Sequence, residues 1–157
     1  MISNVKGEFS RVAGSAEFDP ANLAASHVEA TIDSASVNTR EAQRDAHLKS
    51  HDFLDVGRYP AITFRSSKIV SAGENRYGVV GDLTIRGVTR EVTLHVESLT
   101  PEIRDPDGLL RRGASATTRI ARKDFGLTWN AVLESGGFVV GEDVEITIDV
   151  ELVREAA

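Results

Sequence analysis

The sequence contains no cysteine among its 157 residues. This excludes a disulfide framework, a thiolate nucleophile and a cysteine-ligated metal or iron–sulfur cluster. Aromatic residues are scarce, at 6%, and no apolar run approaches the roughly 18 residues that a membrane-spanning helix requires. The first residues lack the basic-then-apolar order of a secretory signal. The chain as given is therefore expected to be cytoplasmic, or periplasmic or secreted if an N-terminal segment is missing.

The charge balance is acidic, with 24 Asp and Glu against 18 Lys and Arg and a formal net charge of −6. A nucleic-acid-binding domain usually carries a basic stripe that neutralises phosphates, so no nucleic-acid partner is expected. The length suffices for one domain with a sizeable core. Because no repeat or linker divides the chain, we expect a single domain over residues 1–157.

Apolar residues recur with a period of two. In the segment HVEATIDSASV, for example, Val28, Ala30 and Ile32 alternate with polar neighbours. This alternation predicts strands with one buried face, and short connecting turns predict that the strands are antiparallel. About eight strands are expected from this pattern, at residues 4–11, 12–19, 27–37, 60–70, 78–87, 90–98, 113–121 and 144–152.

One or two short helices interrupt the strand pattern. Asp19 followed by Pro20 has the form of a helix start, although ANLAAS allows only a turn or two. Asn38 with Glu41 three residues later has the form of a capping box. This pair predicts a helix over residues 40–50, which would form a surface or lid element.

Antiparallel strands with one apolar face either pack on a second sheet or close into a barrel. A barrel of eight strands is filled by its own side chains or holds one slender ligand. The predicted inner faces consist mainly of Val, Ile, Leu and Ala. Both a filled core and a long apolar slot fit this composition.

Few residues suggest chemistry. His47 and His51 have the spacing that places two imidazoles on one helix face, and Asp55 follows. The glutamate of an HExxH motif is absent and no clear third ligand is near in sequence, so we expect a solvated helix face and no metal. No serine has the GxSxG context of a nucleophile. The sequence therefore predicts no catalytic residues.

Arginines are the more suggestive polar group. Arg40 and Arg44 share a face of the predicted helix, and others lie near strand ends, namely Arg86, Arg90, Arg111, Arg112 and Arg122. Several of them around a barrel mouth would receive an anionic head group through charge-assisted hydrogen bonds. The alternative interpretation is that each arginine only pairs with one of the abundant acids.

Three segments carry a family resemblance. The first is IDSASVNTREAQRDAHLKSHDFLDVGRYPAITFRS, with matching positions that include Asp33, Arg44, His47 and Phe53. The second is GDLTIRGVTREVTL, and the third is RKDFGLTWN. Together they resemble, in the right order, the pattern of the YceI-like family of bacterial lipid-binding proteins. The strand that usually opens members of the family, of the form W-x-I-D-P, does not precede the segment that begins at Met1. We therefore expect that either the given chain is shortened at its start, or the barrel closes another way, through an open sheet edge or strand exchange with a partner subunit.

The resemblance implies an all-β fold, a lipocalin-like extended antiparallel β-barrel of about eight strands. It also implies a protein that binds, carries or sequesters a polyisoprenoid or prenyl-quinone-like lipid without catalysis, commonly as a homodimer, with the lipid as the only bound group. Arg40 and Arg44 are the expected head-group residues. The expected apolar wall comprises Phe18, Ile32, Leu48, Phe53, Phe64, Leu83, Ile85, Leu94, Ile120, Trp129, Ile146 and Ile148.

Two rival hypotheses remain at this point. One is an enzyme that acts on a small ligand in the barrel, with acid–base residues on the 39–55 segment, such as Asp45, His47 or Asp55. A wet pocket with buried ionisable groups would favour it, whereas a dry tunnel would favour lipid carriage. The other is a β-sandwich with a filled core and an interaction surface.

Overall fold

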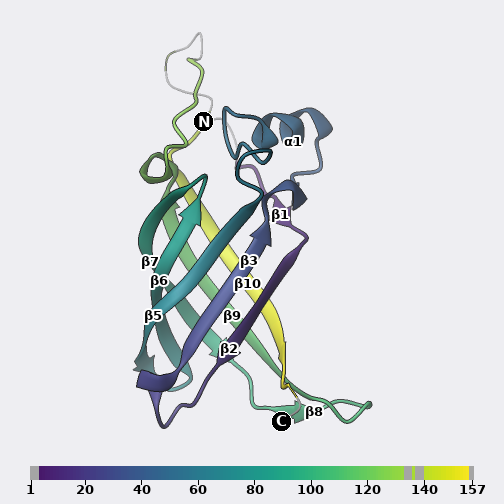
Figure 1. Cartoon of the computed structure of the whole chain (residues 1–157), viewed down its shortest axis with the longest axis vertical. Helices are drawn as coiled ribbons and strands as arrows, with labels where there is room; N and C mark the ends of the chain where they lie inside the picture. Colours follow the sequence, from purple (N-terminus) through teal and green to yellow (C-terminus); the bar gives the residue numbers. More distant parts are fainter. Residues whose placement is uncertain (1–3, 133–135, 137–139, 156–157) are drawn as a thin grey trace.

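The computed structural model describes residues 4–132, 136 and 140–155, and most of these form antiparallel strands (Figure 1). The main sheet has eight strands, seven of them in the order β10-β9-β7-β6-β5-β3-β2, with β8 paired to β9. The strands of this sheet are β2 (Val12–Glu17), β3 (His27–Asp33), β5 (Ala61–Gly73), β6 (Arg76–Ile85), β7 (Val88–Leu99), β8 (Ile103–Arg104), β9 (Leu110–Ala121) and β10 (Asp143–Val153).

The sheet curls into a half-barrel, which confirms the predicted antiparallel β-barrel class. Strands β2 and β10 are its two edges, and no pairing joins them within the described residues. Helix α1 (Ala42–Lys49) lies over one end, and β8 lies at the other (Figure 1). We refer to these as the α1 end and the β8 end. A separate pair, β1 (Glu8–Phe9) with β4 (Val37–Asn38), lies near the α1 end.

The longest strands follow the alternation that the sequence shows. The predicted segment 78–87 is β6, and a two-residue turn of Arg86 and Gly87 joins it to β7. Both turn residues have positive φ, at 50° and 72°, the geometry that matches the twist of paired strands. A side chain at residue 87 would also collide with the ring of Tyr59. Glycine is therefore required there by both φ and space.

Three local predictions differ from the structure in their bounds or caps, although the first helix is as short as predicted. The 4–11 segment is a strand only at Glu8–Phe9. The first helix is a single 3-10 turn, η1 (Leu23–Ala25), because the Asp19 carboxylate accepts from the backbone of Ala21 and makes a local turn ahead of it. Helix α1 begins after Glu41, whose side chain caps the backbone N–H of Arg44.

The predicted cap, Asn38, has a different role. Its side-chain oxygen accepts from the N–H of Arg40 at 2.9 Å. Arg40 has a φ of 64°, in the left-handed region, so the chain turns sharply there before the helix begins. The predicted cap was therefore three residues too early, and the helix begins two residues later than predicted, since the side-chain oxygen of Asn38 serves this turn.

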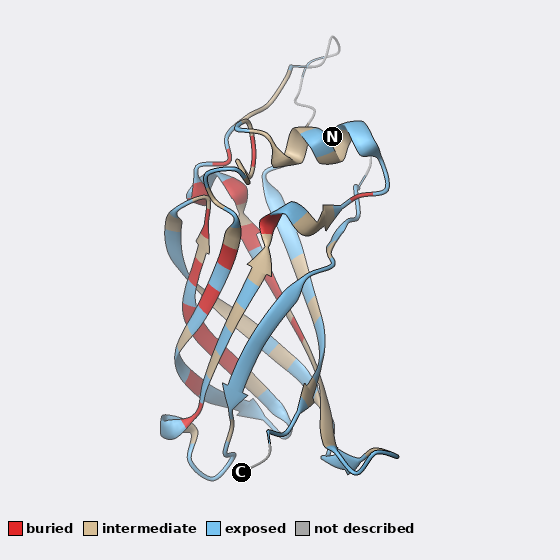
Figure 2. Cartoon of the chain, turned by 45° about the vertical axis from the view of Figure 1, so that its right-hand side comes forward, coloured by how far each residue is buried: buried red, intermediate tan, exposed pale blue. Residues whose placement is uncertain are grey.

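The core lies along the middle of the sheet (Figure 2). Residues buried to 8% exposure or less there include Ile62 and Phe64 of β5, Val79 and Leu83 of β6, and Ile120 of β9. Strand β2, by contrast, is exposed at every residue, and β10 has no buried residue. Burial therefore falls off toward the two open edges of the half-barrel.

Candidate functional site

One face of the curled sheet is mostly apolar. In antiparallel strands, directly paired residues point to the same face. The register pairs Ile32 with Ile62, Phe64 with Leu83, and Val79 with Leu94. We call this inward face the trough. On β2, β3, β9 and β10, the trough comprises the even-numbered residues. On β5 and β7 it comprises the even-numbered residues up to Ser66 and up to Val96, where a bulge follows, and on β6 it comprises the odd-numbered residues.

The trough is not covered along its open side. Val12 of β2 pairs with Ile32, and Val144 of β10 pairs with Ile120, so both valines face inward. They are nevertheless 54% and 40% exposed, and Val150, also inward, is 38% exposed. Apolar side chains on the concave face of a sheet reach such exposure only when nothing fills the space before them. The described chain therefore leaves part of its inner surface open to solvent.

The predicted wall residues fall into three groups. The trough holds Ile32, Phe64, Leu83, Ile85, Leu94, Ile120, Ile146 and Ile148. Leu48, Phe53 and Trp129 lie at the α1 end. Phe18 lies beyond β2, with its ring edge-on to Tyr77 at 5.1 Å. The prediction did not name Phe125 and Leu127, which are 1% and 8% exposed, since neither belongs to an alternating strand pattern.

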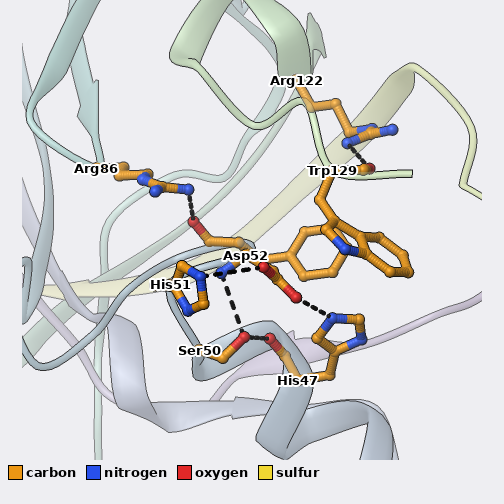
Figure 3. Close-up of polar contacts among 8 residues, drawn as sticks. His47, Ser50, His51, Asp52, Arg86, Arg122 and Trp129 are labelled. Atoms are coloured by element: carbon orange, nitrogen blue, oxygen red, sulfur yellow. Dashed lines mark hydrogen bonds and ion pairs between the residues drawn. The ribbon is translucent and has the colours of Figure 1, made fainter. Parts of the chain in front are cut away.

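At the α1 end, an aromatic cluster is built around His47. Its ring lies edge-on to Phe53 at 5.0 Å and to Trp129 at 4.5 Å, and its Nε2 lies 2.9 Å from an Asp52 carboxylate oxygen (Figure 3). The turn after α1 holds Asp52 and Phe53 in place, and Arg86 donates from the β6–β7 turn to the Phe53 carbonyl at 2.9 Å. The cluster thus joins the helix, this turn and the segment around Trp129.

Arg122 anchors the Trp129 segment through hydrogen bonds to backbone carbonyls. Its guanidinium donates to the carbonyl of Trp129 at 2.9 Å (Figure 3). It also donates to the carbonyls of Leu127, at 2.6 Å, and Gly141. Only 6% of the residue is exposed, and this burial lowers the pKa of Arg122 from its ordinary value. The sequence suggested a head-group contact here, whereas the structure gives this arginine a positioning role for Trp129.

The predicted head-group arginines lie beside α1 and are not equivalent. Arg44 donates from Nε to the Thr39 hydroxyl and from Nη2 to the Thr39 carbonyl, both at 2.8 Å. Asp45 accepts from the hydroxyl and N–H of the same threonine, and these hydrogen bonds lower the pKa of the Asp45 carboxyl. Arg40 is exposed to solvent. The structure therefore brings Arg44 into a local network with Thr39, away from Arg40.

The histidines predicted for a solvated helix face differ in their surroundings. His47 is in the aromatic cluster, whereas His51 has a side chain that is 84% exposed. Asp55 lies in the turn after α1, 3.9 Å from Arg58. Within the described residues, no three His, Asp or Glu side chains are grouped as metal ligands. No described helix is long and apolar enough to span a membrane.

The wall of the half-barrel also has an opening between β7 and β9. The two strands pair only from His95 to Leu99 on β7, and above this stretch a cleft of about 700 Å³ separates them. Its lining includes inward residues such as Val92 and outward ones such as Arg119, so it opens through the sheet. Phe125, on the 3-10 helix η3 (Arg122–Phe125), lies beside it.

Known proteins show the same sequence pattern and fold. A profile of the YceI-like domain matches residues 1–152. A UPF0312 protein of Vibrio cholerae is 39% identical over 125 residues, which cover 80% of this chain and 66% of that protein. A UPF0312 protein of Ectopseudomonas mendocina is 38% identical over 149 residues, or 95% of this chain and 74% of that one.

Solved structures agree with this result. The crystal structure of a Campylobacter jejuni YceI protein is similar, with a TM-score of 0.82 and 31% identity over 99% of this chain and 88% of that one. Burkholderia cenocepacia BcnA gives a TM-score of 0.79 at 25% identity, over 97% and 90% of the two chains. The profile match, the relatives and the similar solved structures establish that this chain belongs to the YceI-like family.

Proposed function

We propose that the protein binds, carries or sequesters a long-chain amphiphile of the polyisoprenoid class, with the apolar tail lying in the trough. The observation that carries this proposal is the exposure of inward-facing Val12, Val144 and Val150. A filled β-sandwich core would have buried these side chains. An apolar tail laid along the open side would cover them, as the family resemblance implies.

The energetics favour recognition through the tail. Burying one CH₂ group contributes roughly 0.8 kcal/mol, so a tail of many carbons has ample gross transfer energy to offset the loss of translational freedom on binding. Strand β5, with 13 residues, is roughly 40 Å long at the usual rise per residue. The trough therefore suits a long, slender tail rather than a compact ligand.

The proposal does not include catalysis. By register, the inward positions of the described strands hold no Asp, Glu or His. The acid–base candidates on the 39–55 segment have local partners: Asp45 bonds to Thr39, and His47 pairs with Asp52. A general acid or base must reach the reacting atom within hydrogen-bond distance, and none of these groups lies on the trough wall.

We also propose a homodimer, which the two open edges β2 and β10 support because an unpaired edge is a template for another chain.

Native mass spectrometry of the purified protein tests both proposals, because it gives the mass of the assembly and of any retained lipid. We expect two chains with lipid bound, and lipid release on organic extraction. Purified protein that carries no lipid and binds neither prenyl quinones nor prenyl phosphates would refute the proposed function.

A further inference from the structure

The few charged side chains that face into the trough are all cationic. The chain has 24 acidic residues, yet by register none of those on the described strands faces inward. On the seven strands from β10 to β2, the charged side chains at inward positions are two arginines. Arg104 of the short strand β8 also faces inward through its pairing with Leu110, but its Nη1 donates to the carbonyl of Gly108. Arg90 of β7 is opposite Leu83, and Arg112 of β9 is opposite Leu152 of β10. An apolar surface with only cationic charges matches an amphiphile whose head is an oxyanion.

The two arginines lie at different places along the trough. Arg90 is near the α1 end and lines the cleft between β7 and β9, together with the acids Glu91, Asp124 and Glu145. Arg112 is near the β8 end, since its neighbour Arg111 pairs with Ile103 of β8. Arg90 already uses one terminal nitrogen in a hydrogen bond to the carbonyl of Thr89, so Arg112 is the stronger candidate.

Arg112 is held in place but keeps donors free. Its Nε donates to the carbonyl of Thr100 at 2.7 Å, and its guanidinium lies over the ring of Phe18 at 5.8 Å. Two carboxylates of this end, Asp105 and Glu151, pair with Arg111. Within the described part of the chain, Arg112 has no ion pair, and neither terminal nitrogen donates a hydrogen bond. The guanidinium is thus oriented by the protein while two NH₂ groups point to no carboxylate.

We propose that Arg112 binds the oxyanion head group, phosphate or carboxylate, of the amphiphile and places that head at the β8 end, with the tail running toward α1. The inference rests on the binding function proposed above. It differs from the prediction that Arg40 and Arg44 hold the head. A planar guanidinium with two free NH₂ groups offers a bidentate contact to an oxyanion, and the ring of Phe18 orients it further.

The test uses three ligands that separate head from tail: geranylgeranyl phosphate, geranylgeraniol with the same tail, and palmitate. Affinities are measured for the wild-type protein, Arg112→Gln, Arg112→Lys and the control Arg65→Gln. Arg65 is an outward arginine with a 77% exposed side chain, paired with Glu29, so its substitution removes the same charge from the outer face.

We expect Arg112→Gln to weaken binding of the phosphate by about tenfold or more, and of palmitate less, while geranylgeraniol binding changes by less than about twofold. Arg112→Lys should recover part of the loss, and Arg65→Gln should leave all three affinities unchanged. An equal loss for geranylgeraniol, or an equal loss in Arg65→Gln, would overturn the role of Arg112. If the wild-type protein binds none of the ligands, the proposed function itself fails.

Discussion

A valine-to-threonine exchange at Val150 tests the open trough directly. Val150 is inward and 38% exposed, whereas Val153 on the same strand is 44% exposed and pairs with Arg111 on the outer face. Threonine has the shape of valine with a hydroxyl in place of one methyl, and both residues favour strands. The pair of variants Val150→Thr and Val153→Thr therefore differs in little but the face of the sheet.

The expected magnitudes follow from hydration. In the free protein, either hydroxyl stays in contact with water, so the free energy of unfolding should change by about 0.5 kcal/mol or less. A bound tail covers position 150, and burying a hydroxyl without a partner costs about 1–3 kcal/mol. At about 1.4 kcal/mol per tenfold, Val150→Thr should bind geranylgeraniol roughly 5- to 140-fold more weakly than the wild-type protein, while Val153→Thr should bind it equally well.

The assay is a geranylgeraniol titration of each variant, followed by isothermal calorimetry or by the emission of the single tryptophan. Urea unfolding of the same samples reports the stability. The reasoning is refuted if both variants bind like the wild-type protein, or if Val153→Thr loses as much affinity as Val150→Thr. The first result would mean that the tail does not touch β10, and the second that it does not distinguish the two faces.

Three further predictions concern stability. Phe125→Ala removes a ring that is 1% exposed, so urea unfolding should show a loss of about 3–5 kcal/mol; a loss below about 1 kcal/mol would contradict its place in the core. Arg122→Met leaves the carbonyls of Leu127 and Trp129 without their donor. Stability should fall by about 1–3 kcal/mol and Trp129 emission should shift to the red, whereas unchanged emission would argue against its positioning role. The pKa of Asp45 is lowered in the folded state by its hydrogen bonds to Thr39, so this carboxylate stabilises the fold above its unfolded value of 3.8 and the contribution is lost as pH falls through the folded pKa. Between pH 6 and pH 3, Asp45→Asn should therefore lose less stability than the wild-type protein; equal losses would refute the coupling.

Alternation in the sequence was enough to predict most of the sheet. Strands such as β3 and β10 present one apolar residue at every second position, and this pattern placed Ile32 and Ile146 on the inward face. The same reasoning cannot locate Phe125, because it lies on a single 3-10 turn that has no period of its own. It also cannot show that the part of β7 before His95 is not paired with β9, since the separation of two strands leaves the alternation within each strand unchanged.

The polar residues of the site were harder to predict. Sequence spacing grouped Arg40 and Arg44 on one helix face, but the helix begins only after Glu41, and Arg44 turns back to Thr39. Arg112 was one arginine among several near strand ends. Its inward direction depends on the pairing register with β10, and its free donors depend on which carboxylates Arg111 has taken. Neither can be derived from spacing along the chain.

The most direct test of the account is a ligand titration followed by valine methyl NMR. Inward Val12, Val144 and Val150 are exposed to nearly the same degree as outward Val70 and Val153, so exposure alone does not separate the two sets. If the tail lies in the trough, geranylgeraniol should shift the methyl signals of the inward three and leave those of the outward two in place. Shifts confined to the outward valines, or equal in both sets, would contradict the claim that the inner face of the half-barrel is the lipid-binding surface.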